Sequence, residues 1–156
     1  MRKFGIVKTL HCALWQKVFR VNSKVYWPVS STSIFKAPHK IIRGNRFPGL
    51  SKYCYIDARN GVGFGDNVWV GPYVSIISMN HDLNDYTKYI ETDSIQIGDN
   101  CWLGAKSTIL PGVKLGNHVV VAANSVVTKS FKEDNIVIAG NPAKVVKSLP
   151  AYGSLS

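Results

Sequence analysis

The chain has 156 residues, of which 46% are hydrophobic and 18% are charged, and its formal net charge is +10. This length fits one domain, and this apolar content excludes a disordered chain. The sequence contains no stretch of about 18 apolar residues, so no membrane-spanning helix is predicted. The basic N-terminus lacks the long apolar core and the cleavage site of a secretion signal.

The positive charge is concentrated in the first third of the sequence. Residues 1–60 contain 12 lysines and arginines and one acid, Asp57, whereas residues 61–156 contain 7 basic and 8 acidic residues. This asymmetry predicts an acidic partner or an anionic surface, with solubility as the alternative. The three cysteines are far apart and form no CxxC pair, which favours a reducing cytoplasm over a disulfide framework.

The first predicted element is a helix over residues 3–22, within an amphipathic, basic N-terminal arm that we assign to residues 1–30. Its apolar stripe, at the i, i+3, i+4, i+7 spacing of a helix face, consists of Phe4, Val7, His11, Leu14, Val18 and Val21. Two roles remain open for this stripe. It could pack as a lid over the open end of the domain, or it could lie on an anionic membrane with Trp15 at the headgroup level.

The main predicted domain covers residues 31–147, and much of it repeats every six residues. From Ile97 the hexapeptides read IGDNCW, LGAKST, ILPGVK, LGNHVV, VAANSV and VTKSFK, and an upstream block from Phe64 reads FGDNVW, VGPYVS and IISMNH. Six is a multiple of the strand period of two and not of the helix period of 3.6. The pattern therefore predicts a parallel β-helix with three hexapeptides per triangular coil. We expect the aliphatic first positions to fill its interior and the glycines to serve corners that need unusual φ.

The period breaks next to His81. Phe64, Val70 and Ile76 predict a further start at residue 82, but the next clear start is Ile97. Residues 82–94 are therefore predicted to leave the coil as a polar loop, and loops on rigid scaffolds often carry function. His81 lies where the loop begins, and a neutral imidazole suits general-base work at cellular pH. A last strand at 136–140 and a loose tail at 148–156 complete the predicted elements.

The ordered set of motifs resembles the hexapeptide-repeat acyltransferases, particularly the branch of galactoside, maltose and nodulation-factor O-acetyltransferases and the polysaccharide O-acetyltransferases. The resemblance runs from about Gly61 to Lys147, on GDNVWVGPYVS, NHD, IGDNCWLGAKSTILPGVKLG, SVVTK and AGNPAKVV. It implies an all-β fold, a left-handed parallel β-helix of about five coils with an N-terminal helix and a short C-terminal tail. It also implies a homotrimer with acetyl-CoA bound between neighbouring helices.

The same resemblance implies a reaction and its residues. His81 would take the proton of a carbohydrate hydroxyl, which attacks the thioester of acetyl-CoA directly. The residues that match the family's CoA contacts are Trp102, Gly104, Ala105, Ala123, Thr128, Lys129, Lys144 and Lys147. Ala105 can serve through its backbone N–H, and the last two lysines would face the nucleotide phosphates. The acceptor side matches less well, and its candidate contacts are Asp57, Arg59, Asn60, Asn80 and Asp82.

Other interpretations stay open at this point. The acceptor could be an amino sugar or an antibiotic acetylated on nitrogen, or the β-helix could be a non-catalytic scaffold. The γ-class carbonic anhydrases share the fold but use three histidines on zinc, and only His81 and His118 are suitably spaced, so no metal is expected. Cys101 is predicted to be buried and structural. We expect a cytoplasmic enzyme that acts on a surface polysaccharide or glycan precursor, with no nucleic-acid partner. Peripheral contact with the inner face of the membrane is expected only if the helix binds lipid.

Overall fold

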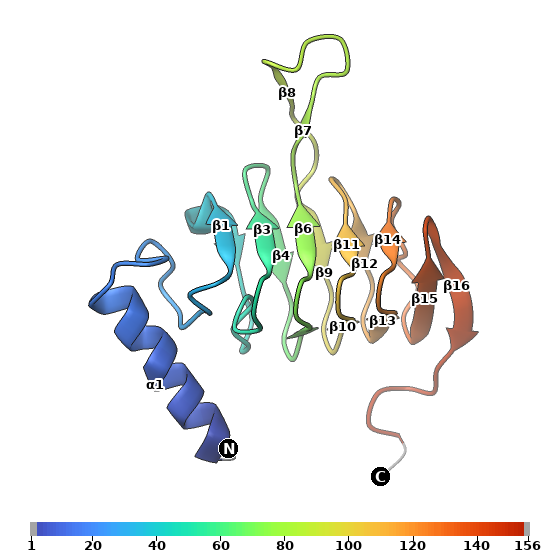
Figure 1. Cartoon of the computed structure of the whole chain (residues 1–156). Helices are drawn as coiled ribbons and strands as arrows, with labels where there is room; N and C mark the ends of the chain where they lie inside the picture. Colours follow the sequence, from blue (N-terminus) through green and yellow to red (C-terminus); the bar gives the residue numbers. More distant parts are fainter. Residues whose placement is uncertain (1–2, 155–156) are drawn as a thin grey trace.

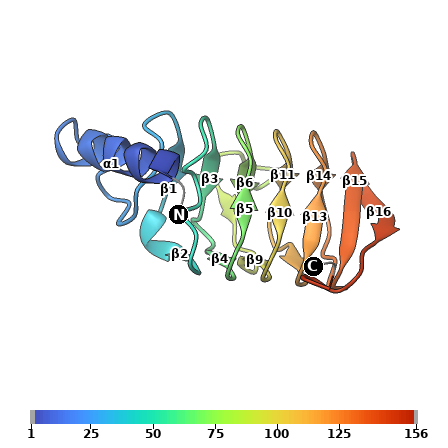
Figure 2. The same ribbon diagram turned by 90° about the horizontal axis from the view of Figure 1, so that it is seen from below.

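The computed structural model describes residues 3–154, and it shows a row of stacked β coils with the helix α1 (Lys3–Lys17) at the N-terminal end (Figure 1). Short strands from successive coils pair into three faces, and a perpendicular view shows the coils lying side by side (Figure 2). None of the helices within residues 3–154 has the length and apolar character needed to cross a bilayer.

The chain visits the three faces, which we call A, B and C, in turn. Face A contains β1 (Ile34–Lys36), β3 (Tyr55–Asp57), β6 (Ser75–Ile77), β11 (Thr108–Ile109) and β14 (Val126–Val127). Face B contains β2 (Ile41–Ile42), which follows the 3-10 helix η1 (Pro38–Lys40), and then β4 (Val62–Phe64), β9 (Ile95–Ile97) and β12 (Lys114–Leu115). Face C contains β5 (Trp69–Val70), β10 (Trp102–Leu103), β13 (Val119–Val121), β15 (Ile136–Gly140) and β16 (Ala143–Ser148).

The register of these strands confirms the hexapeptide prediction. Thr108 pairs with Val126 and Trp102 with Val120, so three hexapeptides make one coil of 18 residues. The aliphatic first positions of the six repeats from residue 97 are all buried: Ile97, Leu103, Ile109, Leu115, Val121 and Val127. The predicted parallel β-helix is therefore confirmed, and its interior is the hydrophobic core.

The prediction that glycines supply the unusual φ of the corners was wrong at most corners. Between faces B and C and between faces C and A, left-handed backbone is adopted by non-glycine residues instead, for example Asn100 (φ 57°) and Asn124 (φ 58°). The repeat glycines are needed for close packing of the coils. A Cβ on Gly98 would lie 2.5 Å from the carbonyl oxygen of Gly116 on the next coil. At the corner between faces A and B, Gly61 and Gly112 do adopt left-handed backbone.

The N-terminal end of the β-helix is closed by the segment that follows α1. Val25, Trp27 and Val29 are buried and belong to the hydrophobic core. The indole N–H of Trp27 donates to the carbonyl of Pro48 at 2.9 Å, and its ring packs edge-on against Phe35. At the other end, β16 pairs antiparallel with β15 and completes face C. The first coil therefore has a built cover that does not consist of the predicted helix stripe.

Candidate active site

The loop predicted between the two blocks of repeats contains a hairpin that projects from the coils (Figure 1). Its strands, β7 (Asn80–His81) and β8 (Tyr89–Ile90), pair antiparallel, with His81 opposite Tyr89. The hairpin leaves the corner between faces A and B, which we call edge AB. This edge also carries residues 58–61, 110–113 and 128–130. The broken hexapeptide period thus marked the departure of the chain, but it gave no sign of the strand pairing inside the loop.

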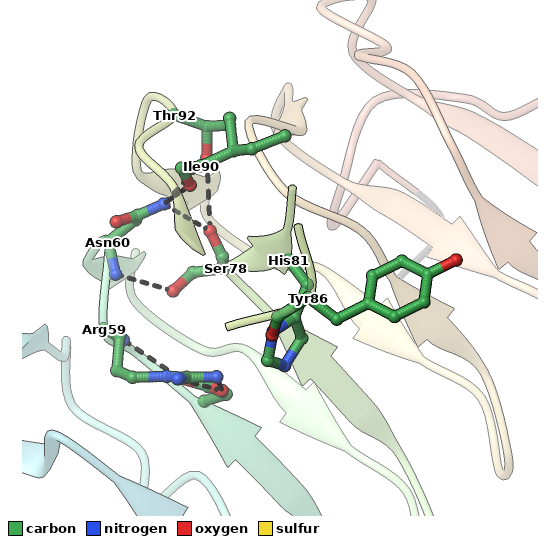
Figure 3. Close-up of polar contacts among 8 residues, drawn as sticks. Arg59, Asn60, Ser78, His81, Tyr86, Ile90 and Thr92 are labelled. Atoms are coloured by element: carbon green, nitrogen blue, oxygen red, sulfur yellow. Dashed lines mark hydrogen bonds and ion pairs between the residues drawn. The ribbon is translucent and has the colours of Figure 1, made fainter. Parts of the chain in front are cut away.

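The tip of the hairpin fixes the orientation of His81. The Asp85 carboxylate accepts hydrogen bonds from the backbone N–H and the hydroxyl of Thr87 and pairs with Lys88 at 3.0 Å. This turn presents the backbone carbonyl of Tyr86 to the imidazole, and Nδ1 of His81 lies 2.5 Å from that oxygen (Figure 3). Asp85 and Lys88 therefore help to position the histidine through the shape of this turn.

This contact decides which ring nitrogen of His81 is available for chemistry. A carbonyl oxygen can only accept a hydrogen bond, so Nδ1 must carry the hydrogen and donate it. In the neutral imidazole the other nitrogen, Nε2, then has a free lone pair. The side chain is exposed, so a substrate can reach it. His81 therefore has the tautomer, the accessibility and the fixed ring that a general base requires.

A stack of three side chains leads from His81 back to the coils. The rings of His81 and Tyr89 lie 4.4 Å apart between centroids, and the guanidinium of Arg59 lies 4.4 Å from the centroid of the Tyr89 ring. Arg59 in turn makes a two-pronged ion pair with Asp57, with a shortest distance of 2.7 Å. Tyr89 was not identified from the sequence, because its contact with His81 depends on antiparallel pairing and not on the six-residue period.

The Asp57–Arg59 pair is an anchor for this stack. Asp57 is only 1% exposed. Burial disfavours its charged form, but the hydrogen bonds from the side chain and backbone of Arg59 outweigh that cost and hold the pKa of Asp57 below its usual value. The hydrogen bonds that the Arg59 guanidinium donates to the Asp57 carboxylate raise the pKa of Arg59. Both groups are therefore charged across the physiological range, and the guanidinium is held in place beneath Tyr89.

Asn60 fastens the base of the hairpin to edge AB. Its amide nitrogen donates to the carbonyls of Ser78 and Ile90 and to the hydroxyl of Thr92, at 3.0, 3.2 and 3.1 Å (Figure 3). Its backbone N–H donates to the Ser78 hydroxyl at 2.9 Å. The two ends of the loop are thus tied to one side chain, which fixes where the hairpin leaves the coil.

The five acceptor candidates lie together at edge AB, but they are not equally available to a ligand. The carboxylate of Asp57 and the amide of Asn60 are occupied by the contacts just described, and an Asp82 oxygen accepts the backbone N–H of Asn84 at 2.7 Å. Asn80 is exposed beside His81 on β7, and Arg59 is partly exposed. Since the guanidinium of Arg59 is itself paired with Asp57, Asn80 is the candidate with an exposed side chain that none of these contacts occupies.

The residues that resemble CoA contacts are spread over two edges and face C of one chain. Thr128 and Lys129 lie on edge AB, the same edge as His81. Ala105 and Ala123 lie on successive coils at the corner between faces C and A, which we call edge CA, and face A separates the two edges. The remaining members lie on face C or beside it, and these are Trp102, Gly104, Lys144 and Lys147. One chain therefore does not gather the whole set around its own His81.

Cys101 and His118, the other two residues considered for chemistry in the sequence, make contacts typical of structural residues. Cys101 is fully buried, its thiol lies 3.2 Å from the carbonyl of Gly116, and burial raises its pKa to about 11, which makes a reactive thiolate unfavourable. Nδ1 of His118 lies 2.9 Å from the Asn135 side-chain oxygen, and its ring packs against Tyr152. Within residues 3–154 no group of three or more His, Cys, Asp or Glu side chains is arranged to hold a metal.

Comparison with known sequences agrees with this architecture. Residues 94–129 match the family described as Bacterial transferase hexapeptide (six repeats). One relative is WbbJ of Escherichia coli K12, which carries the provisional name of a lipopolysaccharide biosynthesis O-acetyl transferase. It is 36% identical over 110 residues, which cover 63% of this chain and 56% of WbbJ. This chain spans about half the length of the curated relatives that it matches.

Solved structures resemble the chain over almost its whole length. A maltose O-acetyltransferase from Clostridium difficile 630 superposes with a TM-score of 0.63 and 25% identity, covering 96% of this chain and 90% of that one. A galactoside acetyltransferase in complex with coenzyme A gives a TM-score of 0.67 and 22% identity, covering 96% and 84%. These comparisons confirm the fold and the resemblance to hexapeptide-repeat acetyltransferases.

Proposed function

We propose that this chain transfers the acetyl group of acetyl-CoA to a hydroxyl of a carbohydrate acceptor, with His81 as the general base. The observation that carries the proposal is the hydrogen bond from Nδ1 of His81 to the Tyr86 carbonyl, which leaves Nε2 free to accept a proton. Relatives named as O-acetyltransferases and a likeness to acetyltransferase structures support the choice of reaction.

The chemistry follows from that free nitrogen. Nε2 accepts the proton of the acceptor hydroxyl as the hydroxyl oxygen attacks the thioester carbonyl carbon. The C–S bond then breaks, and the proton passes from the imidazolium to the departing thiolate, so that the base is regenerated. A backbone N–H at the corner that contains Gly104 and Ala105 can stabilise the oxyanion, because this donor is rigid and needs no side chain.

The residues on edge CA and face C suit the binding of acetyl-CoA, the acetyl donor. Ala105 and Ala123 have small side chains on successive coils, which leaves their backbone accessible to an extended pantetheine arm. Lys144 and Lys147 are exposed on β16, and neither forms an ion pair with an acidic side chain of residues 3–154, so both can face phosphate groups. Acetyl-CoA supplies the activated acyl group, and the chain supplies its position and the base.

A homotrimer would complete the site. His81 and the corner with Ala105 lie on different edges of one chain, so a neighbour's edge CA has to approach edge AB for both to reach one thioester. A closed ring with threefold symmetry makes this contact three times and leaves no unpaired edge, which an open chain of copies would not do. The same arrangement would place three equal sites in one assembly.

An assay with different acceptor molecules distinguishes this proposal from N-acetylation and from a non-catalytic scaffold. Purified protein is incubated with radiolabelled acetyl-CoA and a panel of neutral glycans, acidic glycans, amino sugars and aminoglycosides, with the His81→Ala variant as control. Label on a glycan hydroxyl supports the proposal. Label on nitrogen instead supports N-acetylation, for which N-acyltransferases of the same fold provide precedent. A chain that does not bind CoA in calorimetry is a scaffold, and the proposal is then wrong.

A further inference from the structure

One face of α1 points away from the protein. Val7, Leu10, Leu14 and Val18 follow each other at the i, i+3 and i+4 spacing of a helix face, and we call them the outer row. The helix ends at Lys17 and not at residue 22 as predicted, but the Val18 N–H still donates to the Leu14 carbonyl at 2.8 Å, so Val18 continues the row. Their exposed fractions are 67%, 65%, 54% and 61%. Phe19, which follows directly, is 58% exposed. Val7, Leu14 and Val18 belong to the stripe predicted from the sequence, while the side chain of Phe4 lies outside the described residues. A contiguous apolar row of this kind marks a surface that contacts something else.

The opposite face of the helix holds it in this orientation. Cys12 is buried, and the amide nitrogen of Gln16 donates to the carbonyls of Asn22, Val25 and Trp27 at 3.3, 3.1 and 3.0 Å. The amide oxygen of Gln16 accepts the backbone N–H of Val29 at 3.3 Å. Rotating α1 to bury the outer row would break these hydrogen bonds. The outer row is therefore turned outward by a built contact.

The open end of the β-helix does not need the outer row as a lid, because other residues already cover it. The N-terminal end of the β-helix is closed by Val25, Trp27 and Val29, which belong to the core. Burying the outer row is not required to cover interior aliphatics. In Figure 1, α1 extends from the first coil in the direction opposite to the hairpin with His81. A surface that contacts α1 therefore does not have to displace that hairpin.

Charge decides what kind of surface fits the outer row. Residues 1–60 contain 12 basic residues and one acid, and that acid, Asp57, is already paired with Arg59. Lys17, Arg20 and Lys24 are exposed around the end of the row. A second copy of the chain would bring the same excess of positive charge against itself. An anionic surface instead attracts these basic side chains, and each one that lies near a membrane increases the partitioning of the protein onto it by about fivefold.

We propose that the outer row of α1 docks on an anionic phospholipid bilayer, with its apolar side chains in the headgroup region and the flanking basic side chains on the lipid phosphates. This inference does not depend on the acetyltransferase activity. The helix lies in the plane of the membrane surface and the β-helix stays in the aqueous phase. A carbohydrate acceptor attached to a lipid would be brought close to the enzyme by this contact.

The test is co-sedimentation of the full chain with vesicles of phosphatidylcholine alone or mixed with phosphatidylglycerol. The Leu10→Asp and Leu14→Asp variants remove apolar contact from the outer row, and each should reduce partitioning at least about tenfold. Ile42→Asp is the matched control, because Ile42 is an apolar side chain that is 75% exposed on β2, far from α1 in the chain. Lys17→Glu tests the charge, and Lys132→Glu, an exposed lysine near the other end of the β-helix, is its control. Circular dichroism verifies that every variant is folded.

We expect binding only with phosphatidylglycerol, a steep decrease as salt is raised, and normal binding of both control variants. The proposal is overturned if the wild type does not bind vesicles with phosphatidylglycerol at low salt. It is also overturned if Leu10→Asp binds these vesicles as well as the control Ile42→Asp does. It is also overturned if Leu10→Asp changes the molecular mass in light scattering without vesicles, because the outer row is then an interface between copies. Retention on an acidic protein matrix without any vesicle binding would assign the surface to an acidic protein partner instead.

Discussion

Removing the Tyr89 ring should impair catalysis through His81 and not through donor binding. The ring of Tyr89 lies 4.4 Å from the His81 imidazole between centroids, and the guanidinium of Arg59 lies 4.4 Å from the Tyr89 centroid. An aromatic pair contributes about 0.5–1.5 kcal/mol, and an exposed cation–π contact contributes about 0.5–1 kcal/mol. If this free energy holds His81 in its productive orientation, Tyr89→Ala lowers kcat by roughly 5- to 60-fold.

Steady-state kinetics with a double-mutant cycle measures this effect. Tyr89→Phe keeps the ring and should stay within about twofold of wild type. Tyr86→Ala is the matched control, because the Tyr86 ring is 73% exposed and His81 uses only the backbone carbonyl. In a His81→Ala background, Tyr89→Ala should cause no further loss, because its effect acts through the histidine. An equal further loss in that background, or a raised KM for acetyl-CoA with normal kcat, would refute the positioning role.

Three further predictions concern assembly, donor binding and stability. Light scattering should give three chain masses, and an active monomer would contradict the trimer. Lys144→Glu and Lys147→Glu should raise the KM for acetyl-CoA with little change in kcat, since the nucleotide is remote from the reacting atoms, and a loss confined to kcat would show that the phosphates bind elsewhere. Asp57→Asn should lower the free energy of unfolding at pH 7 by about 1–3 kcal/mol. Because the pKa of Asp57 is lowered by folding, its stabilisation is complete above the usual value of 3.8 and is lost as the pH falls through the folded pKa. Chemical denaturation of wild type and variant should therefore give curves that converge at low pH, and a constant difference would count against the ion pair.

The parts of the fold that depend on periodicity were predictable. Ile97 and Leu103 lead adjacent hexapeptides, and a residue that recurs every six positions can face one interior only in a β structure. Their burial and the order of the strands follow from that rule. The rule also located the departure of the chain near His81, but the hairpin begins at Asn80, two residues before the predicted loop 82–94. The place of His81 at edge AB follows from it too, because the break in the period occurs at one corner of the coil.

Other features depend on contacts that periodicity does not encode. The tautomer of His81 depends on a backbone carbonyl, which every residue has, so the identity of Tyr86 gives no signal. Tyr89 meets His81 through antiparallel pairing inside a loop, where the repeat is absent. The helix stripe was visible in the sequence, but its direction was set by hydrogen bonds of Gln16, a residue on the polar side of the pattern. Asp57 was predicted to contact a sugar, because the sequence alone does not show that Asp57 is buried and paired with Arg59.

The central claim is that His81 is the base of an acetyl transfer, and one comparison tests it most directly. Wild type and His81→Ala are assayed for acetyl transfer to the best acceptor from the glycan panel, and their affinities for acetyl-CoA are measured by calorimetry on the same preparations. We predict a loss of turnover of at least about 100-fold in the variant, the low end of the range for general-base catalysis, with an unchanged affinity for acetyl-CoA. A variant that transfers acetyl groups at the wild-type rate would contradict the assignment of His81 and the mechanism derived from it.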